Sequence, residues 1–376
     1  MSVEKYIDRL REGELLDEPT VIDLCEKVKE LLFFEGNIVP LQAPVTVVSN
    51  VHGQLSDLLE IFRVCGPIPD VNYVFAGDMA DYGYWGIETV CLLFCYRLRY
   101  PSRVTLLRGE HESRAMTKIY GLYLECLRKY GTETVWHALT DTFDYLPVAA
   151  TVDNRAFIVH GGIPRGSTPQ ECLLLDKIRV LNRFTEIPQN SAFCSLFWND
   201  PTDGALGFQR ATRGAGELFG PDIVDQFCHS NRIERIIRGH QLCPQGFQAH
   251  FGGRLFTVWS APNFLGRCGN AGAALEISDA FTFAPAPPLR DAAASTPASD
   301  SAAPGATAAT AAAAPGTGTS PAASPAPRSG ADPDGSIPTI PGFRFNTFLA
   351  APRWLQKVPE PSPDVEIPRG IPEYFQ

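Results

Sequence analysis

Residues 45–112 read VTVVSNVHGQLSDLLEIFRVCGPIPDVNYVFAGDMADYGYWGIETVCLLFCYRLRYPSRVTLLRGEHE, and this stretch decides the fold. Three short apolar runs have the length and β-branched content of buried strands, and they lie at residues 45–49, 73–77 and 104–109. Each run is followed by a segment with helical spacing, near residues 54–64, 86–98 and 116–129. This strand–helix alternation predicts an α/β fold in which helices pack on a sheet.

The chain on either side continues the pattern. Apolar residues recur at helical spacing over residues 21–34, which predicts an amphipathic helix ahead of the first strand. Further strands are predicted at AFIVHGG, RIIRGHQ and RLFTVWSAP, with fewer helices between them. Near the other end of the sequence, FRFNTFLAAPRW begins with alternating residues at Phe343, Phe345 and Thr347, which predicts one more strand.

Composition divides the chain into three parts. The 376 residues, 44% hydrophobic and 20% charged, are enough for a sizeable core, and length alone suggests about two to three domains. Residues 281–342 consist mostly of Ala, Pro, Ser, Thr and Gly, so this segment lacks the apolar area that would offset its ordering entropy. We therefore expect a folded domain over residues 1–280, a disordered insert over 281–342, and a returning strand with a Pro-rich tail over 343–376.

Charge and hydropathy exclude several classes of protein. The formal charge is −10, from 42 acidic and 32 basic residues without a basic stripe, which argues against nucleic-acid binding. No apolar run approaches the roughly 18 residues that span a bilayer, and the N-terminal segment lacks the apolar centre of a signal peptide. The ten cysteines form no CxxC pair, so we expect free thiols in a reducing compartment, the cytoplasm and also the nucleus.

Polar side chains follow most of the predicted strands, at the point where each strand ends. They are Asn50, His52, Asp78, Asp81, Glu110, His111, His160 and His240. Because sites in open α/β sheets lie beyond the carboxyl ends of the strands, we expect these groups to converge on one crevice. A mixed histidine and carboxylate set of this size can hold two divalent metals that share a bridging carboxylate.

A single histidine proves little, because most are surface or hydrogen-bonded core residues. We keep that interpretation for His137, His229 and His250. The other four of the seven histidines lie at strand ends, with glycines nearby that let the backbone turn tightly beside a ligand. Their common placement favours a metal site over coincidence.

Seven short blocks carry a resemblance to a known family. SNVHGQ, GDMADYG, LRGEHESR, HGG, RGAG, RGHQ and SAPN follow, in order and spacing, the motifs of the phosphoprotein phosphatase superfamily of Ser/Thr phosphatases. From about residue 7 to 278 the chain resembles the type 2A-like catalytic subunits, and EIPQNSAFCSLFWNDP and TVWSAPN resemble the type 6 branch. The resemblance implies a metallophosphatase-like fold of mixed α/β (α+β) class, a central β-sandwich flanked by helices.

The same resemblance implies a dinuclear metal centre for hydrolysis of phosphoserine and phosphothreonine. The two divalent ions would be manganese in vitro, with iron and zinc as alternatives. The first ion would be held by Asn50, His52 and Asp78. The second would be held by Asp78, Glu110, His160 and His240.

The resemblance also assigns roles to residues beside the metals. A metal-activated hydroxide would attack phosphorus, and His111, oriented by Asp81, would protonate the departing alkoxide. Arg213 would hold the phosphoryl oxygens. We expect a structural role for Arg108, which lies in the same block as His111.

The chain departs from the family pattern within the site itself. Asn50 stands where the family has Asp, Glu110 where it has Asn, and Tyr82 where it has a phosphate-binding Arg. Phe264 and Leu265 replace a Tyr-Cys pair. Both carboxylate charges are kept but one moves from the first metal to the second, so we expect metal binding to persist, more weakly at the first position. Loss of one clamping arginine removes a few kcal/mol of transition-state stabilisation.

Three functions remain open at this point. The first is a Ser/Thr protein phosphatase whose activity Asn50, Tyr82 and Glu110 reduce, and the second is a pseudophosphatase that acts as a binding or regulatory module. A third, hydrolysis of nucleotides or small phosphates, is disfavoured by RGAG and SAPN. The resemblance implies phosphoprotein substrates and scaffold or regulatory subunits of the type 2A-like kind. The sequence ends in IPEYFQ, with Gln376 where those relatives have the Leu whose carboxylate is methylated.

Overall fold

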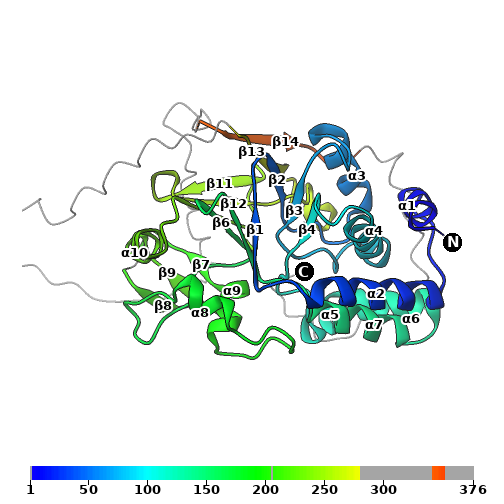
Figure 1. Ribbon diagram of the computed structural model, residues 1–376, viewed down its shortest axis with the longest axis horizontal. Coiled ribbons are helices and arrows are strands. Elements are labelled where there is room, and N and C mark those ends of the chain that lie inside the picture. Colours follow the sequence, from blue (N-terminus) through cyan, green and yellow to red (C-terminus); the bar gives the residue numbers. More distant parts are fainter. Residues whose placement is uncertain (1, 205, 280–340, 352–376) are drawn as a thin grey trace, which may run out of the picture.

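Two mixed β-sheets form the centre of the computed structural model, which describes residues 2–204, 206–279 and 341–351 (Figure 1). The first sheet has six strands in the order β1 (Ile38–Leu41), β5 (Ala149–Val152), β6 (Ala156–Val159), β10 (Arg235–Arg238), β12 (Leu255–Val258) and β11 (Phe247–His250). The second has five, in the order β14 (Phe343–Phe348), β13 (Gly272–Ile277), β2 (Val45–Val48), β3 (Tyr73–Phe75) and β4 (Val104–Leu106). A small third sheet joins β7 (Asp200–Pro201), β9 (Glu217–Phe219) and β8 (Phe208–Arg210).

An apolar core fills the space between the two large sheets. Val47 and Val74 on one sheet and Ile158 and Phe256 on the other belong to this core, and all four are fully buried. Such strands, buried on both faces, read as continuous apolar runs in the sequence. The predicted central β-sandwich is confirmed.

Helices cover the outer face of each large sheet (Figure 1). On the second sheet, α3 (Leu55–Cys65) contacts β14 and α4 (Gly86–Arg99) contacts β4. A further layer of helices packs around α4, consisting of α1 (Val3–Arg11), α2 (Glu18–Phe33), α5 (Arg114–Tyr120), α6 (Leu122–Tyr130) and α7 (Thr134–Phe143). The first sheet is covered by α8 (Leu175–Arg179), α9 (Ala192–Trp198) and α10 (Pro221–Asn231). The amphipathic helix predicted over residues 21–34 is α2, which begins where the Asp17 carboxylate accepts the Thr20 N–H.

The helix predicted near residues 116–129 is in fact two helices. The chain breaks at Gly121, whose φ of 137° favours glycine. The break is used by the neighbouring loop, because the Tyr120 carbonyl accepts the Tyr82 N–H and the Asp81 carboxylate accepts the Leu122 N–H. Helical spacing could not reveal this break, because the apolar pattern continues across it.

Parallel pairing brings the ends of three strands to one edge. β2 pairs with β3 and β3 with β4, in a register that sets Val47 beside Val74 and Val74 beside Thr105. In the other sheet, β6 and β10 are also parallel. The loops that carry the predicted site residues therefore leave neighbouring strands in the same direction.

Strand β14 closes the second sheet from the far end of the sequence. It pairs antiparallel with β13, and its Phe345 ring stacks on Phe247 with centroids 4.0 Å apart. The predicted returning strand is confirmed. The predicted insert and tail fall on residues 280–340 and 352–376, outside the described part of the chain, so the proposed domain boundaries stay predictions.

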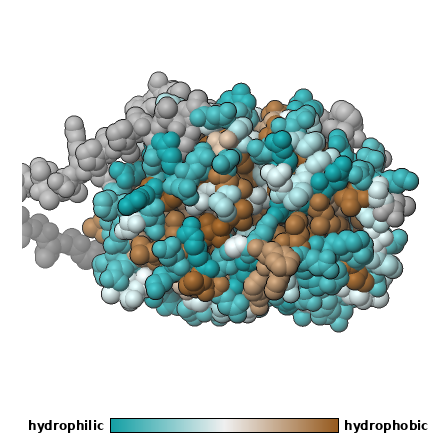
Figure 2. Space-filling model, viewed as in Figure 1, coloured by the Kyte–Doolittle hydropathy of each residue, from teal (hydrophilic) through white to brown (hydrophobic). Residues whose placement is uncertain are grey.

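Two properties of the described residues bear on the excluded classes. No helix among them is long and apolar enough to cross a membrane. The ten cysteines are free thiols. Figure 2 shows a mixed surface on one face, with hydrophobic side chains scattered among hydrophilic ones.

The packing of β14 generates a stability prediction. Replacing Phe345→Ala removes the ring that stacks on Phe247 and packs near Phe256, so we expect the free energy of unfolding to fall by about 2–3 kcal/mol. The exposed neighbour Thr347→Ala should change it by less than about 0.5 kcal/mol. Chemical denaturation followed by circular dichroism measures both, and equal effects would mean that the Phe345 ring contributes nothing to stability.

Candidate active site

Strained backbone marks the loops at the ends of the central strands. Five site residues lie in the left-handed region: Asn50 (φ 56°), His52 (φ 49°), Asp78 (φ 58°), Asp81 (φ 68°) and His240 (φ 66°). Each such non-glycine residue costs on the order of 1–3 kcal/mol, and such strain gathers at functional sites. The surrounding structure must therefore hold these residues in place.

One buried carboxylate supplies much of that restraint. Glu112 accepts three backbone N–H groups, those of Asp78 (2.8 Å), Met79 (2.8 Å) and Gly109 (2.7 Å). Burial, reinforced by the nearby Asp78 charge, raises the pKa of Glu112 to about 7. Glu112 thereby ties the loop after β3 to the loop after β4. Its only sequence signal is its place directly after Glu110 and His111.

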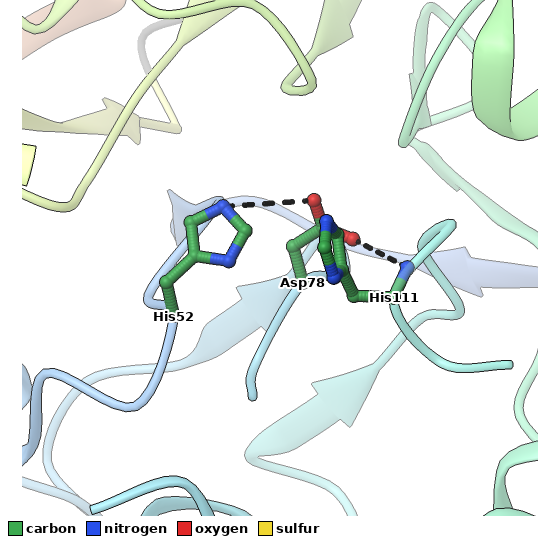
Figure 3. A group of neighbouring side chains, drawn as sticks. All are labelled: His52, Asp78 and His111. Carbon is green, nitrogen blue, oxygen red and sulfur yellow. Dashed lines mark hydrogen bonds and ion pairs between the residues drawn. The ribbon is translucent and has the colours of Figure 1, made fainter. Parts of the chain in front are cut away.

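The first group of candidate ligands consists of His52, Asp78 and His111 (Figure 3). His52 donates from Nδ1 to the Ala80 carbonyl (3.2 Å), which leaves its Nε2 lone pair directed at Asp78 Oδ2, 3.7 Å away. The other Asp78 oxygen accepts the His111 N–H at 3.0 Å. Burial lowers the pKa of His52 to about 4, so its imidazole is neutral.

Asn50 lies beside this group with its amide nitrogen toward it. Nδ2 donates to Asp78 Oδ2 at 2.8 Å and lies 3.3 Å from His52 Nε2. The amide oxygen accepts the His240 N–H at 2.8 Å and the Ser49 hydroxyl at 3.0 Å. Asn50 is almost completely buried.

The second group consists of Glu110, His160 and His240, all buried. His240 Nδ1 lies 2.6 Å from Glu110 Oε1, and His160 Nε2 touches Glu110 Oε2 and lies 3.3 Å from Asp78 Oδ2. His160 donates from Nδ1 to the Ala76 carbonyl at 2.6 Å. Burial opposes ionisation of Glu110, but His160 and His240 outweigh it and hold its pKa well below the usual value.

These atoms fit a divalent metal. Glu110 Oε2 and His160 Nε2 are buried without a hydrogen-bond partner of acceptable geometry, although they face each other. Two carboxylates and two imidazoles are ligands that zinc, iron and manganese accept. Asp78, Glu110, His160 and His240 would hold such an ion.

His111 and Asp81 form a second, separate pair. His111 Nδ1 lies 2.6 Å from Asp81 Oδ2, and Asp81 Oδ1 accepts the Leu122 N–H at 2.8 Å. Burial alone would lower the pKa of His111, but the Asp78 and Asp81 carboxylates outweigh it and raise the pKa to about 9. The imidazole can therefore carry a proton at neutral pH, as a general acid must.

The two arginines of interest lie in different places. Arg213 sits at the edge of the second group, with Nη1 2.7 Å from His240 Nε2 and Nη2 3.3 Å from Asp200 Oδ2. Its side chain is 43% exposed, so a ligand can reach it. Arg108 is fully buried and points away from the site, toward the Thr185 carbonyl and Asp144, which is the structural role expected for it.

An aromatic wall stands where the sequence lacks the family's second arginine. The Tyr82 ring centroid lies 5.1 Å from those of His52 and His111 and 5.0 Å from that of Phe264. Trp259 and Tyr120 extend the wall. Burial raises the pKa of the Tyr82 hydroxyl, so this group is neutral.

The structure brings together all the residues predicted for the site. Asn50, His52, Asp78, Asp81, Glu110, His111, His160 and His240 converge, with Arg213 at their edge. His137 and His250 lie elsewhere. His137 lies on α7, close to Glu133 just before that helix, and His250 faces Thr257. The sequence reasoning missed Glu112, Asp200, Tyr120 and Trp259. Three of these four lie within quoted blocks: Glu112 in LRGEHESR, Asp200 in EIPQNSAFCSLFWNDP and Trp259 in TVWSAPN. Tyr120 lies in none of them.

Comparisons with known proteins agree with this geometry. Residues 43–244 match the family model described as calcineurin-like phosphoesterase. The chain is 46% identical over 291 residues to a protein phosphatase 2A catalytic subunit of Dictyostelium discoideum, covering 76% of this chain and 92% of the relative. It is also 46% identical over 298 residues to the serine/threonine-protein phosphatase PP2A-like PPG1 of Saccharomyces cerevisiae, covering 75% and 79%. The predicted type 2A-like resemblance is confirmed.

A solved structure gives the same answer for the fold. The chain is similar to a protein serine/threonine phosphatase from Saccharomyces cerevisiae, described as similar to human phosphatase PP5. The TM-score is 0.69 at 33% identity, over 74% of this chain and 90% of that chain.

The position of Arg108 generates a prediction that separates structural from catalytic arginines. Replacing Arg108→Met removes the fully buried guanidinium that pairs with Asp144 and leaves the carbonyls of Glu112, Arg183 and Thr185 without that donor, so we expect the free energy of unfolding to fall by about 3–5 kcal/mol. The matched control Arg63→Met removes an exposed arginine that pairs with Glu60 and should cost under about 1 kcal/mol. Thermal and urea unfolding measure the difference. A stable Arg108→Met protein would contradict the structural assignment.

Proposed function

Because the chain belongs to the calcineurin-like phosphoesterase family, among its PP2A-like Ser/Thr protein phosphatases, we propose that it hydrolyses phosphoserine and phosphothreonine in proteins. The observation that carries the proposal is the pairing of a metal-fitting cluster with a histidine–carboxylate pair beside it. The cluster is Asp78, Glu110, His160 and His240, and the pair is His111 with Asp81. Hydrolysis of a phosphomonoester by a metal-activated water with a protonated leaving group uses both parts.

His111 is the proposed general acid. Its Nδ1 is held by Asp81, which fixes the ring and leaves Nε2 free to give a proton to the departing alkoxide of the serine or threonine. Asp81 is itself held by the Leu122 N–H, so the pair is anchored to the start of α6. Asp81 acts by orienting the ring and stabilising the imidazolium.

A divalent metal would lower the pKa of a bound water toward neutrality and neutralise charge on the phosphoryl group. The ligands proposed for it are Asp78, Glu110, His160 and His240. In the family, the resemblance implies, a second ion lies at the place of Asn50, His52 and Asp78. Manganese suits assays in vitro, with iron and zinc as alternatives, because carboxylate and imidazole ligands accept all three.

Arg213 is the proposed phosphate ligand. An arginine only donates, so its hydrogen bond to His240 requires Nε2 of that ring to be unprotonated. If His240 binds a metal through Nδ1, its proton must lie on Nε2, and Arg213 has to leave. The partly exposed guanidinium is then free to hold two phosphoryl oxygens.

The pseudophosphatase alternative has one specific observation in its favour. The Tyr82 ring occupies the place of the missing arginine and, with Phe264, packs against His52 and His111. Removing a charge-assisted contact of this kind commonly costs about two to three decades in rate. The surviving residues, chiefly His111, Asp81 and Arg213, favour slow hydrolysis over none.

Substrates and partners follow from the same proposal. Phosphoproteins are the proposed substrates, and scaffold or regulatory subunits of the type 2A-like kind are the proposed partners. Nucleic acid and membranes are not expected partners of a chain with a formal charge of −10. Ten free cysteines suit the reducing cytoplasm or nucleus.

Hydrolysis of phosphopeptides by the purified full chain tests the proposal. With added Mn²⁺, we expect release of phosphate from phosphoserine and phosphothreonine peptides at a rate well above that of His111→Ala and Asp78→Asn. His111→Ala should lose about two to four decades in kcat, because general acid catalysis contributes that much. Activity no higher than in these two variants would support the pseudophosphatase instead. Faster hydrolysis of nucleotides than of phosphopeptides would favour the disfavoured third function.

Restoring the family residues provides a second prediction. The double variant Asn50→Asp with Tyr82→Arg returns a charged ligand and a phosphate-binding guanidinium, so we expect kcat on the same peptides to rise by about two decades. The single variant Tyr82→Phe, which keeps the ring and removes only the hydroxyl, is the matched control and should leave the rate nearly unchanged. No gain in the double variant would place the barrier elsewhere in the site.

A further inference from the structure

The orientation of the Asn50 amide is fixed by its surroundings. A backbone N–H can only donate, so the side-chain atom 2.8 Å from the His240 nitrogen must be the amide oxygen. The same oxygen accepts the Ser49 hydroxyl. Gly239 packs against both groups, and a Cβ at that residue would overlap Ser49 Oγ. A flipped amide would set its NH2 group against the His240 N–H, donor against donor, and its oxygen against the Asp78 carboxylate.

The amide nitrogen therefore points at the groups that would bind the first metal. Its two hydrogens face Asp78 Oδ2 at 2.8 Å and His52 Nε2 at 3.3 Å. The His52 lone pair is directed there because Nδ1 donates to the Ala80 carbonyl. The amide NH2 group therefore lies between these two acceptors, at the place where a cation would otherwise neutralise them.

A carboxylate at residue 50 would have the opposite effect. One oxygen would still accept the His240 N–H and the Ser49 hydroxyl. The other would face the Asp78 carboxylate and the His52 lone pair, where acceptors repel without a cation between them. Aspartate at this position would need a cation or a proton between these acceptors, whereas asparagine brings its own donors and removes that need.

The second position shows the reverse arrangement. Glu110 Oε2 and His160 Nε2, both potential metal ligands, converge there with Asp78 Oδ2, the oxygen that also accepts the Asn50 amide. Among the described residues, no amide donates to Glu110 Oε2 or to His160 Nε2. The two buried carboxylates carry a formal charge that one divalent ion neutralises. In the family pattern, the first metal position has its own carboxylate. In this chain that carboxylate is at the second position instead, as Glu110.

We infer that this chain binds a single divalent cation, held by Asp78, Glu110, His160 and His240, and that the Asn50 amide fills the position of the other ion. The inference rests on the proposed function only for the premise that a metal binds in this cluster. It differs from the dinuclear centre that the family resemblance implies. His52 then serves as an acceptor for Asn50, and Asp78 connects the amide to the metal.

Metal stoichiometry tests the inference without reference to activity. The full chain is freed of metal with a chelator, reloaded with excess Mn²⁺, and desalted, and the bound manganese is measured by mass spectrometry. We expect one ion for each wild-type chain, with the electron paramagnetic resonance spectrum of an isolated Mn²⁺ ion. Two ions, or the spectrum of an exchange-coupled pair, would overturn the inference, and so would no bound ion.

Three variants sharpen the test. Asn50→Asp should raise the stoichiometry to two ions and produce the coupled spectrum. Asn72→Asp adds the same charge directly before β3, at the end of the strand opposite the cluster, and should leave the stoichiometry at one ion. Glu110→Gln should raise the dissociation constant for Mn²⁺ at least about tenfold, because loss of even an indirect partner commonly costs that much. Should Asn50→Asp fail to fold, the wild-type count and the Glu110→Gln affinity still decide.

The stoichiometry and the phosphopeptide assay can fail separately. A chain that binds one ion but hydrolyses nothing would sink the proposed function and keep this inference. A chain that binds two ions and hydrolyses phosphopeptides would do the reverse.

Discussion

The active site depends on one buried carboxylate that accepts three backbone N–H groups. Glu112 joins the Asp78 and Met79 amides after β3 to the Gly109 amide after β4. Without it, the loops that carry Asp78 and Glu110 would have to satisfy buried donors in some other way, at about 1–3 kcal/mol for each donor left unpaired. The cost of keeping a carboxylate in the interior, seen in its raised pKa, is offset by these hydrogen bonds.

This restraint explains how the site tolerates so much strained backbone. Asn50, His52 and Asp78 adopt left-handed conformations that a free loop would leave. The Asp78 carbonyl accepts the N–H groups of Val51 and His52, so the loop after β2 is bound to the loop after β3. Glycine allows the closest approach, because a Cβ on Gly77 would lie 2.5 Å from the Gly109 backbone. Strain in one loop is therefore maintained by hydrogen bonds to the next.

Much of this could be predicted from the sequence, for a physical reason. Strands buried on both faces leave short apolar runs, and parallel strands place their following residues at one edge, so the runs at residues 45–49 and 73–77 predicted both sheet and site. Features that arise from contacts distant in sequence could not be predicted. The Asn50 oxygen meets a backbone N–H 190 residues away, and the break at Gly121 serves a hydrogen bond to Tyr82. Neither contact leaves a pattern in local composition.

The exchange of residue types at Asn50 and Glu110 shows why total charge is an incomplete guide to a metal site. Adding carboxylates over the whole cluster gives the same sum as in the family, which by itself argues for an unchanged centre. Hydrogen atoms change the conclusion, since an amide brings two donors and a carboxylate brings none. Asn50 places its donors toward Asp78 and His52, whereas Glu110 presents only acceptors to His160 and His240. What a buried position can bind is decided by the balance of donors and acceptors that face it, and here the two neighbouring positions differ in that balance.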